Sequence, residues 1–154
     1  MIVVLIVAIA AGLAVPMLGQ TDATRLRAAA QLLVADLEFA QIESIAHGDD
    51  LRVVVFDLVD NTYHIAAASD STTPITNPIG NQPYETEFGR GRAAELGTVA
   101  LQSYALDGDN ELGFGIYGQL DQTTNATVTL ASGTKTITIT IDAISGETSI
   151  GPVS

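Results

Sequence analysis

Apolar positions dominate the start of the chain, and a helical pattern follows them without a break as far as His47. Residues 1–18 read MIVVLIVAIAAGLAVPML, and the first ionisable side chain after them is Asp22. A charge in the bilayer costs roughly 3 kcal/mol on insertion scales, so an uncharged apolar run is typical of a membrane helix. At 1.5 Å per residue the run is about 27 Å long, against a hydrocarbon core of about 30 Å. We therefore predict that residues 1–20 are the transmembrane part of an N-terminal helix that lacks its first few residues.

Two residues punctuate the apolar run. Pro16 removes one helical hydrogen bond, and its ring points at the carbonyl of Gly12, a residue type that accommodates a distorted backbone, so we expect a kink or a loosened turn there. The alternative is a cleaved secretory signal with Ala8-Ile9-Ala10 as its cleavage site, but no basic region precedes the apolar run. The residues assigned to the membrane and assembly helix are Ile2, Val3, Val4, Leu5, Ile6, Val7, Gly12, Leu13 and Pro16.

Residues 21–48 continue the helix, with Thr21 or Asp22 as its cap and Gly48 as its end. At 100° per residue two opposite apolar stripes form. One holds Leu26, Ala30, Leu33, Leu37 and Ala40, the other holds Ala28, Leu32, Ala35, Phe39, Ile42 and Ala46, and the flanks between them carry Arg25, Asp36, Glu43, Arg27, Gln31 and Glu38. A surface helix needs one apolar face for its own core, so the second face predicts a helix partner. A helix enclosed within its own domain is the alternative.

After Gly48 the pattern changes to strands, and residues 49–154 are predicted to form one antiparallel β domain. A hairpin is expected over 51–57 and 62–67, turning at Asp60-Asn61. Residues 69–97 are expected to be a loop with at most one short strand, either a partner contact or a mobile surface loop. Further strands are expected over 98–106, 112–117, 126–130, 135–141 and 148–150. The fold class is thus α+β, a long helix whose second half covers an antiparallel sheet or small sandwich of about seven strands.

Charge and composition narrow the function classes. The 154 residues include six basic and eighteen acidic side chains, for a net charge of −12. Such a surface repels nucleic acid and anionic lipid, although solubility or a saline habitat also favours acidity. The chain has no cysteine, which excludes disulfides and thiol chemistry.

Candidate chemistry is sparse. His47 and His64 share no motif with a serine nucleophile, and Gly89-Arg90-Gly91-Arg92 lacks the lysine and following helix of a phosphate loop, so it reads as a solvated turn. Alternating carboxylates at Asp107, Asp109 and Glu111 suit Ca²⁺ weakly, because the spacing is not that of an EF-hand, and a solvated acidic turn is the simpler interpretation. We therefore predict a structural protein without catalytic residues or a cofactor, with calcium as the open exception.

The segment MIVVLIVAIAAGLAVPML resembles the N-terminal helix of type IV pilins and type II secretion pseudopilins, which have Gly and Pro in these relative places. The continuation LRAAAQLLVADLEFAQIESIAHGDDLRVVVFD is similar to the GspH and FimT branch of minor pilins and pseudopilins. The pieces 114–118, 132–133 and 145–147 resemble that branch's C-terminal pattern. The prepilin cleavage glycine, the aromatic residue after it and the family's glutamate would all precede Met1, so no residue here is given their roles.

The resemblance implies a minor pseudopilin or minor pilin. Such a subunit is inserted in the inner membrane with its β domain in the periplasm, and secretion or pilus machinery then extracts it into a filament. Its partners would be other pilins through the helix, and the helix-to-sheet or helix-to-helix contacts would be made by Leu26, Leu33, Leu37, Leu32, Phe39 and Ile42. Two alternatives stay open: a DNA-binding minor pilin of an uptake pilus, which the acidity disfavours, and a membrane-anchored β domain that binds a small ligand or calcium.

Overall fold

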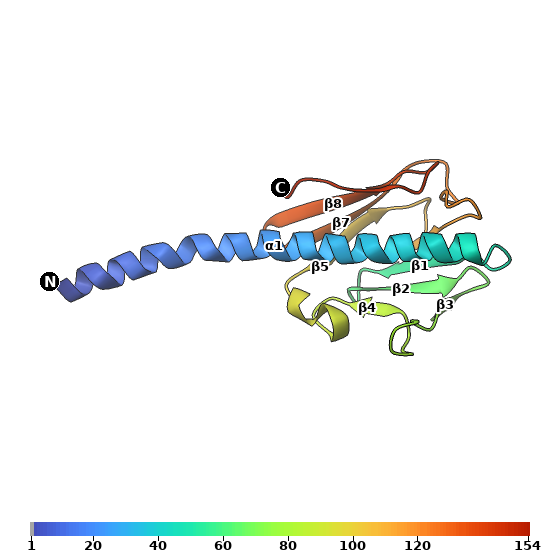
Figure 1. Ribbon diagram of the computed structural model, residues 1–154. Helices are drawn as coiled ribbons and strands as arrows, with labels where there is room; N and C mark the ends of the chain where they lie inside the picture. The colour runs from blue at the N-terminus through green and yellow to red at the C-terminus, as the bar shows by residue number, and fades with distance from the viewer. Residues whose placement is uncertain (1) are drawn as a thin grey trace.

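The computed structural model describes the backbone of residues 2–154 and the side chains of residues 21–154. Its longest element is the helix α1 (Ile2–Ala46), whose N-terminal half extends beyond the strands (Figure 1). The helix continues through Gly12 and Pro16, so the expected new start with a cap at Thr21 or Asp22 is wrong. A proline removes one hydrogen bond and leaves the neighbouring ones in place, so a helix can run past it. The kink itself concerns side chains outside the described ones and stays a prediction.

Nine strands and one short 3₁₀ helix follow α1 within the described chain. The strands are β1 (Arg52–Asp57), β2 (Thr62–Ala67), β3 (Asp70–Pro74), β4 (Glu85–Glu87), β5 (Ala100–Ala105), β6 (Glu111–Gly113), β7 (Ala126–Ser132), β8 (Lys135–Ile141) and β9 (Thr148–Ile150), and the 3₁₀ helix is η1 (Gly91–Leu96). They form two antiparallel sheets. One has the order β3-β2-β1-β6 with β4 also paired to β2, and the other has the order β5-β7-β8-β9. The fold is therefore the predicted α+β arrangement, with two sheets.

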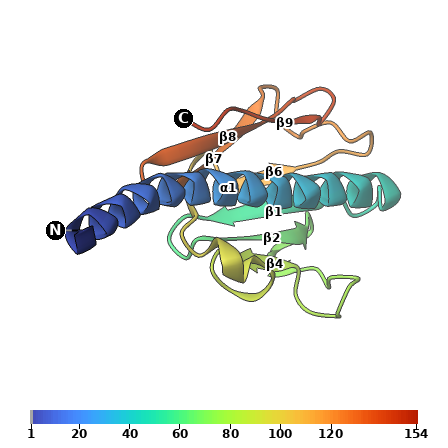
Figure 2. The same ribbon diagram turned by 60° about the vertical axis from the view of Figure 1, so that its left-hand side comes forward.

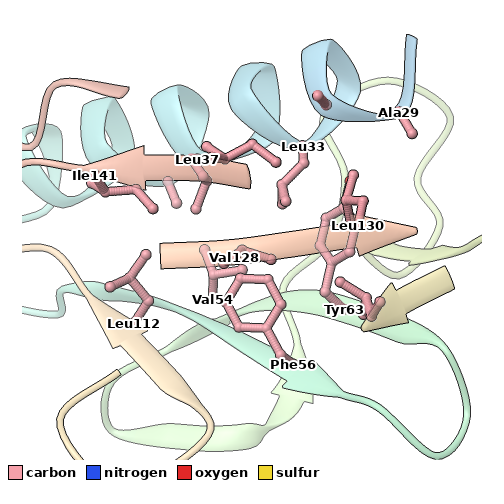
Figure 3. Packing of buried hydrophobic residues seen from close by; sticks show 14 of the residues in the cluster. Ala29, Leu33, Leu37, Val54, Phe56, Tyr63, Leu112, Val128, Leu130 and Ile141 are labelled. Carbon is pink, nitrogen blue, oxygen red and sulfur yellow. The ribbon is translucent and has the colours of Figure 1, made fainter. Parts of the chain in front are cut away.

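The C-terminal half of α1 lies lengthwise over both sheets. Figure 2 shows β1, β2 and β4 on one side of the helix and β7, β8 and β9 on the other. Leu26, Leu33 and Leu37 of α1 are fully buried in the hydrophobic core. Figure 3 shows Leu33 and Leu37 pointing from the helix toward the strands. The strand residues that meet them include Val54, Phe56, Tyr63, Ile65, Leu112, Val128, Leu130, Ile137, Ile139 and Ile141, all at most 1% exposed. Burial of such side chains, at about 1.5–3 kcal/mol each, is the main stabilising term for this domain.

The clearest strand pattern in the sequence is also the most regular part of the structure. In β8 the isoleucines at 137, 139 and 141 are buried, and the threonines at 136, 138 and 140 are half-buried. β7 pairs with β8 over its whole length, from Ala126 opposite Ile141 to Ser132 opposite Lys135. The alternation of one buried and one wetter face is what a two-residue period requires.

Two parts of the strand prediction are wrong. Residues 69–97 hold two strands, β3 and β4, and the helix η1, where at most one short strand was expected. Both strands pair with β2, so they gain their hydrogen bonds from a neighbour that a local pattern does not reveal. The strand expected over 112–117 ends at Gly113, because residues 115–118 close a turn in which Gly118 has a φ of 82°.

The two sheets are joined by one side chain at the β1–β2 turn. Asn61 has a φ of 57°, and its amide group donates to the carbonyl of Val99 at 3.1 Å and accepts from the backbone N–H of Leu101 at 2.7 Å. Through these two bonds the Asn61 amide pairs with the backbone at the start of β5 as an adjacent β-strand would. Asn is among the few residues that adopt a left-handed conformation at modest cost. The side chain that forms the turn therefore also ties the first sheet to the second.

Candidate assembly surface

The face of α1 that points away from the sheets carries a line of exposed residues with small or apolar members. The outward seam, as we call it, consists of Ala28, Gln31, Ala35, Glu38, Ile42 and Ile45. Ile42 is 62% exposed and Ile45 is 53% exposed. Successive members are three and four residues apart, which is the spacing of a seam between two packed helices. Alanine at two of the positions lets a second helix approach closely, and the isoleucines offer it apolar area.

The second apolar stripe of the sequence analysis is only partly free. Ala28, Ala35, Ile42 and Ala46 are exposed, whereas Leu32 and Phe39 are half-buried and pack against the domain core. Phe39 stacks on Tyr84 with ring centroids 4.9 Å apart, because the segment after β3 folds back over that side of the helix. The face available to a partner is therefore rotated away from Leu32 and Phe39.

Asp36, which the helical pattern places on a flank between the two apolar stripes, is buried: it is 2% exposed. Its carboxylate accepts hydrogen bonds from the hydroxyls of Tyr63 at 2.6 Å and Tyr84 at 3.0 Å. The guanidinium of Arg92 pairs with both carboxylate oxygens, and it also lies over the Tyr84 ring, 4.9 Å from its centroid. Thr86 completes the group by accepting from Nε of Arg92 at 2.9 Å. This buried ionic cluster ties β2, β4 and η1 to the middle of α1.

Burial and the charge of Asp36 both act on the two phenols of this cluster. Burial raises the pKa of Tyr63 well above its ordinary value of 10, and the neighbouring carboxylate adds to the effect. The same two causes, again with burial first, raise the pKa of Tyr84 to about 12. Both phenols therefore stay protonated donors to Asp36 at neutral pH. The hydrogen-bonding groups of the cluster are thus engaged with one another.

Arg92 also corrects the interpretation of residues 89–92 as a solvated turn. The members of the cluster are 6 to 56 residues apart along the chain, so no local pattern predicts their contact.

The other candidate chemical groups stay apart. His47 contacts Glu43 at 3.3 Å at the end of α1, and His64 contacts the carbonyl of Ser71 at 2.9 Å in the first sheet. In the part of the chain that the structure describes, no group of three or more acidic, cysteine or histidine side chains is placed to hold a metal ion. Asp107, Asp109 and Glu111 are thus not brought together, and Asp109 instead accepts from the backbone N–H of Glu111 at 3.0 Å. Calcium binding itself stays a prediction.

A hollow of about 700 Å³ lies where the β1–β2 turn meets the end of β5. Phe56 and Tyr104 form its apolar part, and Asp57 and Asp109 contribute carboxylates. The Oδ1 atom of Asp57 accepts from the backbone N–H groups of Val59 and Asp60, so it serves the turn. A small ligand, if the chain binds one, would have this hollow as its candidate site. Asp57 and Asp109 in its lining already accept hydrogen bonds from nearby backbone N–H groups.

Among the residues whose side chains are described, no helix is long and apolar enough to cross a membrane. The predicted membrane segment, with Ile2, Val3, Val4, Leu5, Ile6, Val7, Gly12, Leu13 and Pro16, lies outside those residues.

A long N-terminal helix that packs lengthwise on antiparallel sheets and projects beyond them defines a pilin-like fold. Solved structures confirm this class. The chain is similar to the minor pseudopilin EpsH from the Type 2 Secretion System of Vibrio cholerae, at 15% identity and a TM-score of 0.60, over 83% of this chain and 97% of that one. It is also similar to the type IV minor pilin FimU of Pseudomonas aeruginosa, at 17% identity and a TM-score of 0.60, over 84% of this chain and 90% of that one.

A second crystal form of FimU gives the same result, with a TM-score of 0.57 at 17% identity over 82% of this chain and 93% of that one. No family model matches the sequence, and no curated protein matches it. At these identities the likeness is one of fold. The resemblance to pilins and pseudopilins inferred from the first 57 residues is thereby supported by the structure of the whole β domain.

Proposed function

We propose that the protein is a minor pseudopilin or minor pilin, a non-catalytic subunit of a type II secretion pseudopilus or a type IV pilus. In this proposal it enters the inner membrane through its apolar N-terminal segment, holds its β domain in the periplasm and joins a filament through α1. The observation that carries the proposal is the outward seam: a helix already packed on its own core presents a second line of exposed residues at helix-packing spacing, and four of the six are alanine or isoleucine. The fold shared with EpsH and FimU supports it.

The seam is suited to helix packing and poorly suited to a lone subunit. Ile42 and Ile45 each expose more than half of their surface on the face that also carries Ala28 and Ala35, where a solitary surface helix normally has charged or polar residues. A neighbouring helix in the seam would remove that apolar area from water, at roughly 25 cal/mol per Å². The same helix is free of strands over its N-terminal half, so it has length available for contacts beyond its own domain (Figure 1).

Crosslinking tests this proposal directly, because the chain has no cysteine of its own. We expect full-length chains carrying Ala35→Cys and Ile42→Cys to form dimers and higher ladders with a bismaleimide in the membranes of their host. The matched control is Ala105→Cys. Ala105 is exposed at the end of β5 and does not belong to the outward seam of α1. Seam variants that crosslink no more than the control would refute assembly through this face.

The DNA-binding alternative gains no support from the described structure. Arg52 and Arg92 are held by acidic side chains of their own chain, and Arg90 pairs with Glu87 at 3.2 Å. At least three of the six basic residues therefore pair with acidic side chains of the same chain, whose net charge is −12. A gel shift at low salt that retained DNA would reverse this ranking.

A further inference from the structure

Basic side chains gather at the end of the β domain from which the N-terminal half of α1 projects. Arg25 and Arg27 belong to α1, and Lys135 begins β8. Lys135 pairs with Ser132 across the β7–β8 turn, and the Ser132 hydroxyl donates to the carboxylate of Asp22 on α1 at 3.4 Å. Figure 1 shows that β8 begins beside the helix, where the helix leaves the domain. We call Arg25, Arg27 and Lys135 the basic collar.

The two arginines of the basic collar are available to a partner. Arg27 is exposed and Arg25 is half-buried, and among the described residues neither has an ion-pair partner in its own chain. By contrast, Arg52, Arg90 and Arg92 pair with acidic side chains. The collar arginines therefore carry positive charge that no neighbouring carboxylate of the described chain offsets.

The arginines leave the helix on opposite flanks. They are two positions apart, which is about 200° around the helix axis, and the buried Leu26 lies between them and faces the core. One guanidinium group therefore extends on each side of the contact between α1 and the sheets. Because the Cα–Cβ bonds of a helix tilt toward its N-terminus, both side chains lean toward the apolar run at residues 1–18.

The apolar run determines which chemical groups the arginines meet. In the proposed function, residues 1–18 occupy the hydrocarbon core of a bilayer. Arg25 and Arg27 follow Leu18 by seven and nine residues, so their Cα atoms lie about 10 Å and 14 Å beyond it along the helix axis. The headgroup layer is about 5–7 Å deep on each side of the core, and a long arginine side chain reaches back into or near that layer. A guanidinium group binds phosphate oxygens through paired, charge-assisted hydrogen bonds.

From this placement we propose that the basic collar binds the phosphates of anionic lipid headgroups and seats the β domain on the membrane before the subunit enters a filament. The inference rests on the proposed function and adds a lipid site to it. The chain as a whole has a net charge of −12, so the same headgroups repel most of its surface. Attraction confined to the collar therefore orients the domain, with the β7–β8 turn toward the lipid.

The test attaches a fluorescent dye to Thr134→Cys in the full chain, which has no cysteine of its own. Thr134 is exposed in the β7–β8 turn. The chain is reconstituted in vesicles of phosphatidylcholine, with and without phosphatidylglycerol, and a nitroxide on the lipid headgroups quenches the dye when the turn approaches the surface. We expect stronger quenching with phosphatidylglycerol, and high salt should weaken it.

The arginine variants assign this effect to the collar. Arg25→Gln and Arg27→Gln should each lower the ratio of seated to lifted domains by about fivefold, and the double variant should lower it further. Arg90→Gln is the matched control. It removes the same charge from an arginine that pairs with Glu87, so it should leave the quenching unchanged.

Two further measurements separate the collar from the proposed function: flotation of the chain with the vesicles, and the seam crosslink at Ile42→Cys. Quenching that does not depend on phosphatidylglycerol, or that persists in the double variant, would overturn the lipid site while flotation and the seam crosslink leave the filament role standing. A seam crosslink that falls in the double variant without a change in quenching would assign the arginines to a neighbouring copy and also overturn it. A parent chain that does not float with the vesicles would remove the membrane step of the proposed function, and the collar with it.

Discussion

The substitution Asp36→Ala removes the centre of the buried ionic cluster. It leaves the Arg92 guanidinium without its counter-charge and the hydroxyls of Tyr63 and Tyr84 without an acceptor. Removing one partner of a buried pair costs about 3–5 kcal/mol. The side chain of Arg92 is 31% exposed, so water reaches the abandoned guanidinium and the lower end, about 3 kcal/mol, applies.

For a chain of this length, each kcal/mol lowers Tm by about 2–4 °C, so the expected fall is roughly 6–12 °C. Thermal and urea unfolding of the full chain in a mild detergent, followed by circular dichroism, measure it. Asp36→Asn keeps the shape of the side chain but not its charge, so its Tm should lie between those of the parent chain and Asp36→Ala. Glu38→Ala, an exposed acidic residue two positions later, should change stability by less than about 0.5 kcal/mol. An Asp36→Ala chain that is as stable as the Glu38→Ala chain would refute the argument.

Three further outcomes are expected. Asn61→Gly keeps the left-handed turn but loses both hydrogen bonds to the second sheet, so it should lower the free energy of unfolding by about 1–2 kcal/mol. Asn61→Ala should lower it by about 1 kcal/mol more, because alanine strains that turn. Urea unfolding measures both losses, and equal losses would contradict this. In the folded chain the pKa of Tyr84 is raised from its ordinary value of 10 to about 12. Its contribution to stability should therefore be intact below pH 10 and be lost as the pH rises to 12. Thermal unfolding measured at a series of pH values should show this decline, and Tyr84→Phe should flatten it. Calcium should leave Tm unchanged, and a rise that Asp109→Ala abolishes would establish the calcium alternative.

Patterns with a fixed period predict most of this fold. The 3.6-residue spacing predicts two apolar faces on α1 without saying which one packs on the sheets, and the structure buries the face with Leu26, Leu33 and Leu37. The two-residue alternation of 135–141 identifies β8 to the residue. Both signals are local, because each residue's environment repeats with the geometry of its own element.

Contacts between distant segments explain what the sequence did not reveal. β3 and β4 have little strand character of their own and form because β2 offers them an edge. Asp36 looks like a flank residue on a helical projection, and the side chains that bury it, Tyr84 and Arg92 among them, come from segments far along the chain. The same segment covers Phe39 and narrows the exposed apolar face. Contacts between residues that are 48 or 56 positions apart follow no periodic pattern in the sequence, so they could not be predicted from it.

The C-terminal half of α1 lies lengthwise over both sheets, and this arrangement has a mechanical consequence. Its buried leucines lie in a row parallel to the helix axis, with strands of both sheets alongside (Figure 2). Tension along that axis loads the whole row in shear, so its contacts must yield together, whereas a sideways pull would peel them away turn by turn. A helix embedded in this way passes axial force into both sheets at once, so the domain resists tension along α1 better than a pull across it.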